Sequence, residues 1–252
     1  MVKKWALLRG VTAVKKQTTA IVWPKTRGVF KMQQSENNQV GVLRSDIRIE
    51  LHTIPAIQLW HGRKKTDDKY QIPSMTRAIS YLRIIEIAVR LDDPYADLRL
   101  TEFYQQIEKI KNLLDVENRS IDEVLKSVPT GFKATNATSV KPIDLNLFIN
   151  VPSGYQLVFL LCEFDLFIRK VQLAKHISLI TGNDASDRQN VIAHALRSLI
   201  TYTTKYKRVG VTRKDFVENT PLASEAIEQF GPIPEAILNA DKDRDRILAT
   251  TD

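Results

Sequence analysis

The sequence predicts a mainly helical protein with two short β-strands. Long segments that repeat apolar residues at three- and four-residue intervals predict the helices, whereas two short segments with strict alternation predict the strands. The chain has 252 residues, of which 43% are hydrophobic and 26% are charged. This length and composition are typical of a folded protein that buries a substantial core.

The two predicted strands carry the clearest alternation in the sequence. In RSDIRIELHT, Ile47, Ile49 and Leu51 share one face, and the charged residues between them share the other. A second alternating segment, IDLNLFIN at 143–150, follows a loop at 129–142 that is rich in threonine and proline. We expect the two strands to pair, either within one chain or across a dimer.

Helices are expected between and after these strands. A short helix is expected to begin near Pro55 and end at Gly62, and a longer one at 74–91 has Ser74 as its cap. Residues 153–180 are apolar on nearly every face, which predicts a central core helix. A further helix is expected at about 186–205, followed by short helices around Pro221 and Pro234.

The stretch DDPYAD, at residues 92–97, concentrates three carboxylates in six positions. Asp93 stands directly before Pro94, which is the order typical of a helix N-cap followed by the first helical residue. Apolar residues at helical spacing continue from there to about Val116. The carboxylates are therefore interpreted mainly as the start of a long helix and not as a reactive centre.

The positive charge is concentrated at the N-terminus. Residues 1–35 contain eight basic residues and no acidic one, whereas the rest of the chain carries 29 of each sign. The sequence thus divides into a basic N-terminal arm (residues 1–36) and a mainly helical body (residues 37–252). A basic segment interleaved with aromatic residues favours binding to a phosphate polyanion. A solvated, poorly ordered terminus and an anionic lipid surface are the alternatives.

Motifs for catalysis and for cofactor or metal binding are lacking from the sequence. The four histidines lack metal-ligand spacing, and no glycine-rich phosphate loop or GxSxG motif occurs. The single cysteine, Cys162, lies in an apolar run and is interpreted as a packed core residue. Asp165 is expected on an exposed helical stripe or paired with Arg169. We expect no enzyme activity, no cofactor and no metal.

The basic residues instead predict a surface that follows a phosphate backbone. Further lysines and arginines at 205–214, including Arg213, are expected to extend this surface. The candidate DNA-binding residues are Lys3, Lys4, Arg9, Lys15, Lys16, Lys25, Arg27, Lys31, Arg44, Arg48, Arg63, Lys64 and Lys65.

A set of motifs in this order resembles the AcaB-like transcriptional activators of conjugative plasmids, which have relatives in integrating conjugative elements. The motifs are RSDIRIELHT, HGR, DDPYAD, GYQ, GVTRKD and NTPLASEAIEQFGPIPEAIL. The resemblance runs from about Arg44 to Leu238 and leaves out the basic arm. DDPYAD and GVTRKD are its most specific parts.

The resemblance implies a ribbon-helix-helix-like DNA-binding element within a larger helical domain. In such an element two antiparallel strands from a dimer enter the major groove of DNA. On the first strand Arg48, with Arg44, would read guanine, although Asp46 and Glu50 lie on the same face. On the second strand Asn146 and Asn150 would read adenine, beside Asp144 and Phe148.

The expected function is that of a sequence-specific activator of conjugative transfer genes. The expected partners are double-stranded promoter DNA, a second copy of the chain in a homodimer, and RNA polymerase, with no membrane contact. Such a protein would reside in the bacterial cytoplasm, associated with the nucleoid. The alternative is a non-enzymatic structural or partner-binding component of the conjugation machinery. A nuclease ranks third, because no metal-binding acid cluster stands out.

Overall fold

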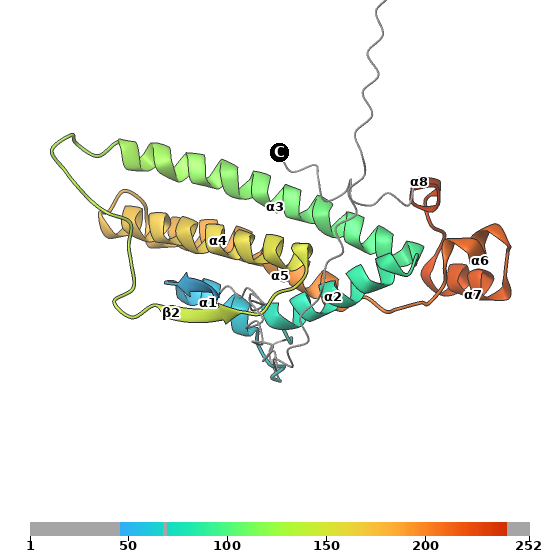
Figure 1. Cartoon of the computed structure of the whole chain (residues 1–252). Helices are drawn as coiled ribbons and strands as arrows, with labels where there is room; N and C mark the ends of the chain where they lie inside the picture. The colour runs from blue at the N-terminus through green and yellow to red at the C-terminus, as the bar shows by residue number, and fades with distance from the viewer. Residues whose placement is uncertain (1–45, 68–69, 241–252) are drawn as a thin grey trace, which may run out of the picture. The chain divides into compact units, whose positions relative to one another are not determined.

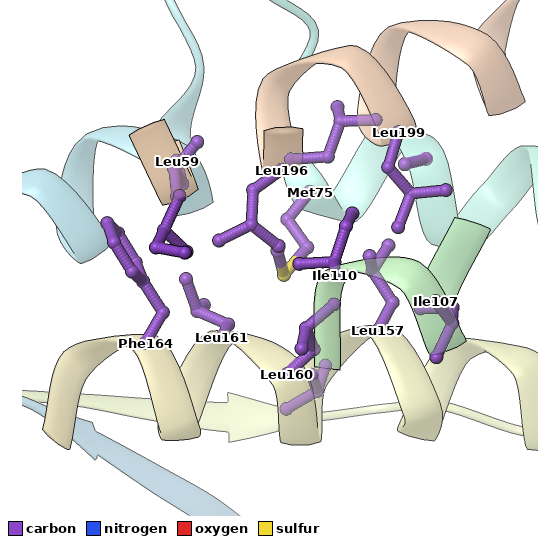
Figure 2. Packing of buried hydrophobic residues seen from close by; sticks show 14 of the residues in the cluster. Leu59, Met75, Ile107, Ile110, Leu157, Leu160, Leu161, Phe164, Leu196 and Leu199 are labelled. Carbon is purple, nitrogen blue, oxygen red and sulfur yellow. The ribbon is translucent and has the colours of Figure 1, made fainter. Parts of the chain in front are cut away.

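Helix α4 (Pro152–His176) is the central element of the computed structural model, which describes residues 46–67 and 70–240. Helices α1 (Ile54–His61), α2 (Met75–Arg90), α3 (Pro94–Lys126) and α5 (Gly182–Thr204) all pack against α4 (Figure 1). Their apolar faces meet in one core, where Leu157, Leu160 and Phe164 of α4 are fully buried (Figure 2). This arrangement confirms the predicted core helix and the mainly helical fold.

Strands β1 (Ile47–Leu51) and β2 (Ile143–Leu147) form a two-stranded antiparallel sheet within one chain. The register pairs Arg48 with Asn146, and Leu51 with Ile143. Leu51 and Leu147 are buried on the inner face, whereas the alternate residues are exposed. Both predicted strands are confirmed, and the pairing question is answered in favour of one chain. We call this sheet the ribbon.

The structure reproduces the predicted helix starts where a capping residue marks them. Ser74 accepts a hydrogen bond from Arg77 N at the start of α2, and Gly62 ends α1 with a φ of 70°. Asp93 Oδ1 accepts hydrogen bonds from Tyr95 N and Ala96 N at the start of α3. Burial raises the pKa of the Asp93 carboxyl above its usual range.

Two helices are longer than predicted. Helix α3 continues past Val116 to Lys126, because Ile121 is fully buried one heptad beyond Leu114. The polar stretch between these two residues hides this continuation in the sequence. Helix α5 begins at Gly182, because the Thr181 side chain accepts from Asp184 N and caps the helix.

The C-terminal part of the described chain forms three short helices. They are α6 (Arg213–Val217), α7 (Pro221–Phe230) and α8 (Glu235–Leu238). The sequence predicted α7 and α8 but not α6. Helix α6 begins with a capping box, in which the Asp215 carboxylate accepts hydrogen bonds from the N–H and the hydroxyl of Thr212. The helices share a small apolar cluster with Tyr95 of α3, whose hydroxyl donates to Gly231 O at 2.7 Å.

Arg213 joins this C-terminal part to the start of α3. Its guanidinium bonds Asp92 Oδ1 at 2.8 Å and also bonds Asp97 Oδ2 and the carbonyl oxygen of Ile237. The motifs DDPYAD and GVTRKD, more than a hundred residues apart in sequence, therefore meet in one buried ion network. The expectation that Arg213 lies on a phosphate-binding surface is wrong, because its guanidinium is buried and forms ion pairs with these carboxylates.

A second buried carboxylate, Asp165 of α4, holds the chain where β1 passes into α1. It accepts hydrogen bonds from Thr53 N at 2.9 Å, from Thr53 Oγ1 at 2.7 Å and from His52 N at 3.2 Å. Its exposed fraction is 3%, so the expected exposed stripe is wrong. Arg169 does not pair with it but donates to Ala137 O in the loop that precedes β2.

A third carboxylate links α2 to the start of α4. Glu86 is buried and accepts from the backbone N–H of Ser153 at 3.1 Å and from the Ser153 hydroxyl. It therefore satisfies N-terminal donors of α4, which would otherwise lack partners inside the protein.

In the described ranges no helix is both long enough and apolar enough to cross a bilayer.

Replacing Arg213 by alanine is expected to lower the free energy of unfolding by about 3 kcal/mol or more, because Asp97 would stay buried without its cation. Urea denaturation measures this loss. Lys214→Ala is the matched control, because the exposed Lys214 forms an ion pair with the exposed Glu218; it should cost less than about 0.5 kcal/mol. Equal losses in the two variants would refute the structural role of Arg213.

Replacing Asp165 by alanine is expected to destabilise the protein by about 2 to 4 kcal/mol, because the donors of His52 and Thr53 would lose their acceptor. Hydrogen exchange should then report faster exchange at these two amides. Glu163→Ala changes an exposed carboxylate two residues away and should leave both rates unchanged. Slow exchange retained in Asp165→Ala would contradict this assignment.

Candidate nucleic-acid interface

The outer face of the ribbon brings the two groups of predicted readers together. Arg48 of β1 lies directly opposite Asn146 of β2, and both are exposed. Side chains directly opposite on one face of an antiparallel pair have Cβ atoms about 5 Å apart. The ribbon thus places a guanidinium and an amide side by side. Arginine suits guanine and asparagine suits adenine in the major groove.

The other end of the same face is acidic. Glu50 lies opposite Asp144, and both carboxylates are exposed. Like charges directly opposite each other destabilise a strand pair. Glu50 Oε1 also lies 3.4 Å from His52 Nε2, and the two side chains form an ion pair only when the imidazole is protonated. The ribbon face is therefore not a general phosphate-binding surface.

The ribbon is anchored from its inner face and from both of its ends. Ile49 and Leu145 are partly buried against the core, beside the buried Leu51 and Leu147. Asp165 holds the exit of β1, as described above. After β2, the Tyr155 hydroxyl of α4 donates to Ile149 O at 3.1 Å. Because these contacts hold the backbone, the outward side chains have a defined orientation.

Two further residues of the second strand segment are exposed beyond the end of β2. The exposed fraction of Phe148 is 94%, and Asn150 is exposed as well. Phe148 and Asn150 extend the candidate interface beyond the paired register.

The basic loop after α1 carries Arg63, Lys64 and Lys65, all of them exposed. Arg63 and Ile72 exchange two backbone hydrogen bonds of 2.8 Å, and the Arg63 guanidinium donates to Tyr70 O. Arg63 is thus held in place. Neither lysine forms a hydrogen bond or ion pair with another described residue, so both ammonium groups are available to an external anion.

The remaining predicted site residues lie outside the described ranges. They comprise Arg44 and the basic residues of the arm: Lys3, Lys4, Arg9, Lys15, Lys16, Lys25, Arg27 and Lys31. Their part in DNA binding stays a prediction. The structure thus brings Arg48 together with Asn146, whereas Asn150 lies beyond the paired register. The sequence named all three, but on alternative ribbons.

Comparisons with known proteins identify a family that this chain matches. A family model described as the transcriptional regulator AcaB matches residues 39–247. A crystal structure of selenomethionine-containing AcaB from uropathogenic E. coli matches with a TM-score of 0.51 and 11% sequence identity, over 79% of this chain and 97% of that chain. At this identity the structural match shows a shared fold. No curated protein matches the chain in sequence.

The family match begins beyond the basic arm and spans most of the described residues. It agrees with the resemblance seen in the motifs RSDIRIELHT, DDPYAD and GVTRKD, which the fold assembles into the ribbon and the Arg213 network. Because the matched region covers far more than half of the sequence, the chain belongs to the AcaB family of transcriptional regulators, a family of regulators and not of enzymes.

Proposed function

We propose that this protein binds double-stranded DNA through the ribbon and activates transcription of conjugative transfer genes. The observation that carries the proposal is the cross-strand pair of Arg48 and Asn146 on the exposed face. A two-stranded ribbon fits the major groove, where such side chains reach base edges. Glu50 and Asp144 on the same face suit the amino group of cytosine, which donates to carboxylates.

The order of elements around the ribbon supports a ribbon-helix-helix-like element. The succession strand, helix, helix occurs twice, as β1–α1–α2 and as β2–α4–α5, with α3 between the two. The two strands pair antiparallel, and every pair among these four helices is in contact. One chain therefore supplies both strands that a ribbon-helix-helix dimer takes from two copies. A homodimer would place two ribbons on two half-sites.

Affinity and specificity would come from different parts of the chain. Because the ribbon face carries carboxylates, the phosphate contacts are assigned to Lys64, Lys65 and the basic arm. Such contacts release condensed counterions and are independent of sequence. The ribbon then selects the promoter. Contact with RNA polymerase and residence at the nucleoid belong to the same proposal.

A partner-binding role within the conjugation machinery is the second candidate. It is favoured by an apolar stripe along α2 and its C-cap residue Leu91, where the exposed fractions of Ile84, Ile87 and Leu91 are 43%, 42% and 52%. These residues recur at helical spacing on one side of the helix. This candidate would take first place if the full chain bound promoter and scrambled DNA equally and only at low salt.

Equilibrium binding of the full chain to a transfer-gene promoter duplex and to a scrambled duplex tests the proposal. We expect a promoter preference that persists when the salt concentration is raised. Arg48→Ala should relax the preference at one base pair by about 1 to 3 kcal/mol. Arg83→Ala, which removes an exposed arginine of α2, is the matched control. Equal weakening on both duplexes by Arg48→Ala would remove Arg48 from base reading.

Charge reversal at Lys15 and Lys16 should weaken binding to promoter and scrambled duplexes alike, because phosphate contacts carry no sequence information. The slope of log affinity against log salt should become shallower by about one for each phosphate that the protein no longer neutralises. Fluorescence anisotropy across a salt series measures both effects. An unchanged slope would assign the arm to a role other than phosphate binding.

A further inference from the structure

A pocket of about 400 Å³ lies between α1 and α5, on residues outside the outer face of the ribbon. Pro55, Gln58 and Leu59 of α1 and the start of the following loop form one wall. Gln189, Ala193 and Arg197, which recur at four-residue intervals on one face of α5, form the other. The volume falls within the range of small-molecule sites in proteins, about 300 to 1,000 Å³.

The described lining of this pocket carries positive charge and includes no carboxylate. Arg63 and Arg197 are the ionisable residues among the described lining residues, and Gln58, Gln189 and Asn190 add side-chain amides. Arginine and amide groups together offer many N–H donors to a single anion. The lining therefore has the chemistry of an oxyanion site.

Backbone contacts of the loop, and not a salt bridge, position Arg63. A Cβ at Gly62 would lie 2.5 Å from Ile72 O, so only glycine lets the loop return this closely to α1. That return creates the Arg63–Ile72 backbone pair, and the neutral carbonyl of Tyr70 accepts from the Arg63 guanidinium. Among the described residues, no carboxylate forms an ion pair with Arg63 beside the pocket.

Arg197 is half-buried and forms no hydrogen bond or ion pair with another described residue. Burial, followed by repulsion from Arg63, lowers the pKa of its guanidinium. A second hollow also includes Arg197 and is lined by His194, Tyr202 and Lys205, again without a carboxylate among its described lining residues. Two like charges beside one pocket repel each other until an anion lies between them.

We propose that this pocket binds a phosphate group carried by a small molecule, with Arg63 and Arg197 as its ligands. The planar fork of each guanidinium matches the geometry of phosphate oxygens. The concave shape favours a small molecule over the backbone of a DNA duplex. The proposal does not rest on DNA binding by the ribbon, because the arginines, the amides and the pocket are present in the chain alone.

Isothermal titration of the full chain with inorganic pyrophosphate, at constant ionic strength adjusted with sodium chloride, tests the proposal. We expect saturable binding at one site per chain. Arg197→Gln should raise the dissociation constant at least tenfold. Arg83→Gln, with the same change of charge on an exposed face of α2, should stay within twofold of the unchanged protein. Absence of saturable binding, or equal loss in the two variants, would overturn the proposal.

Thermal unfolding without pyrophosphate separates a ligand-binding arginine from a structural one. Arg197→Gln should leave the melting temperature unchanged or raise it, because the substitution removes repulsion and no described ion pair. A lower melting temperature together with unchanged pyrophosphate binding would show a purely structural arginine and overturn the proposal.

A promoter duplex serves as the second arm of the experiment. Loss of DNA binding in Arg197→Gln, with no pyrophosphate binding by the unchanged protein, would assign the pocket to the DNA backbone and overturn the small-molecule proposal. Pyrophosphate binding that depends on Arg197, in a protein that does not prefer promoter DNA, would support the pocket and contradict only the DNA-binding function.

Discussion

The hydrogen bonds of Asp165 fix the position of the ribbon, and the candidate interface depends on them. This carboxylate projects from the central helix α4 and accepts from the amides of His52 and Thr53 and from the Thr53 hydroxyl. It therefore holds the two residues that directly precede α1, whose N-cap Thr53 makes no side-chain capping bond. Burying a carboxylate costs free energy unless its oxygens accept hydrogen bonds. The junction of β1 and α1 therefore has one favourable position on α4.

The same physical solution recurs at two other junctions. Glu86 of α2 satisfies the start of α4 through Ser153, and Asp92 and Asp97 hold Arg213 at the start of α6. In each case a buried carboxylate satisfies donors that come from a distant part of the chain. Hydrophobic packing around α4 is not directional, whereas these bonds have fixed geometry. They therefore set the register in which the helices and the C-terminal segment meet.

Both strands of the ribbon come from one chain. Its two strands differ in sequence, so the face they present is asymmetric: Arg48 stands beside Asn146, and Glu50 stands beside Asp144. A ribbon made from two copies of one strand would repeat a single set of side chains. In the proposed DNA-binding role, an asymmetric ribbon would contact an asymmetric base sequence with one copy of the protein. The arginine pocket between α1 and α5 gives the same fold a second surface with a different chemical preference.

The sequence by itself determined the local structure wherever a short-range signal exists. Alternation located both strands, and Ser74, Asp93 and Gly62 marked helix ends through bonds or backbone angles that involve near neighbours. Arg48, Asn146 and the loop lysines could be named as candidate DNA-binding residues because they fall on the polar face of a strand or in a charged loop. Only the tertiary structure decided which of these residues lie side by side. The pairing of β1 with β2, the burial of Asp165 and Arg213, and the approach of Arg197 to Arg63 all join residues about a hundred positions or more apart. No periodicity along the chain encodes such contacts, because they arise from the packing of whole helices and from the requirement that buried charges find partners.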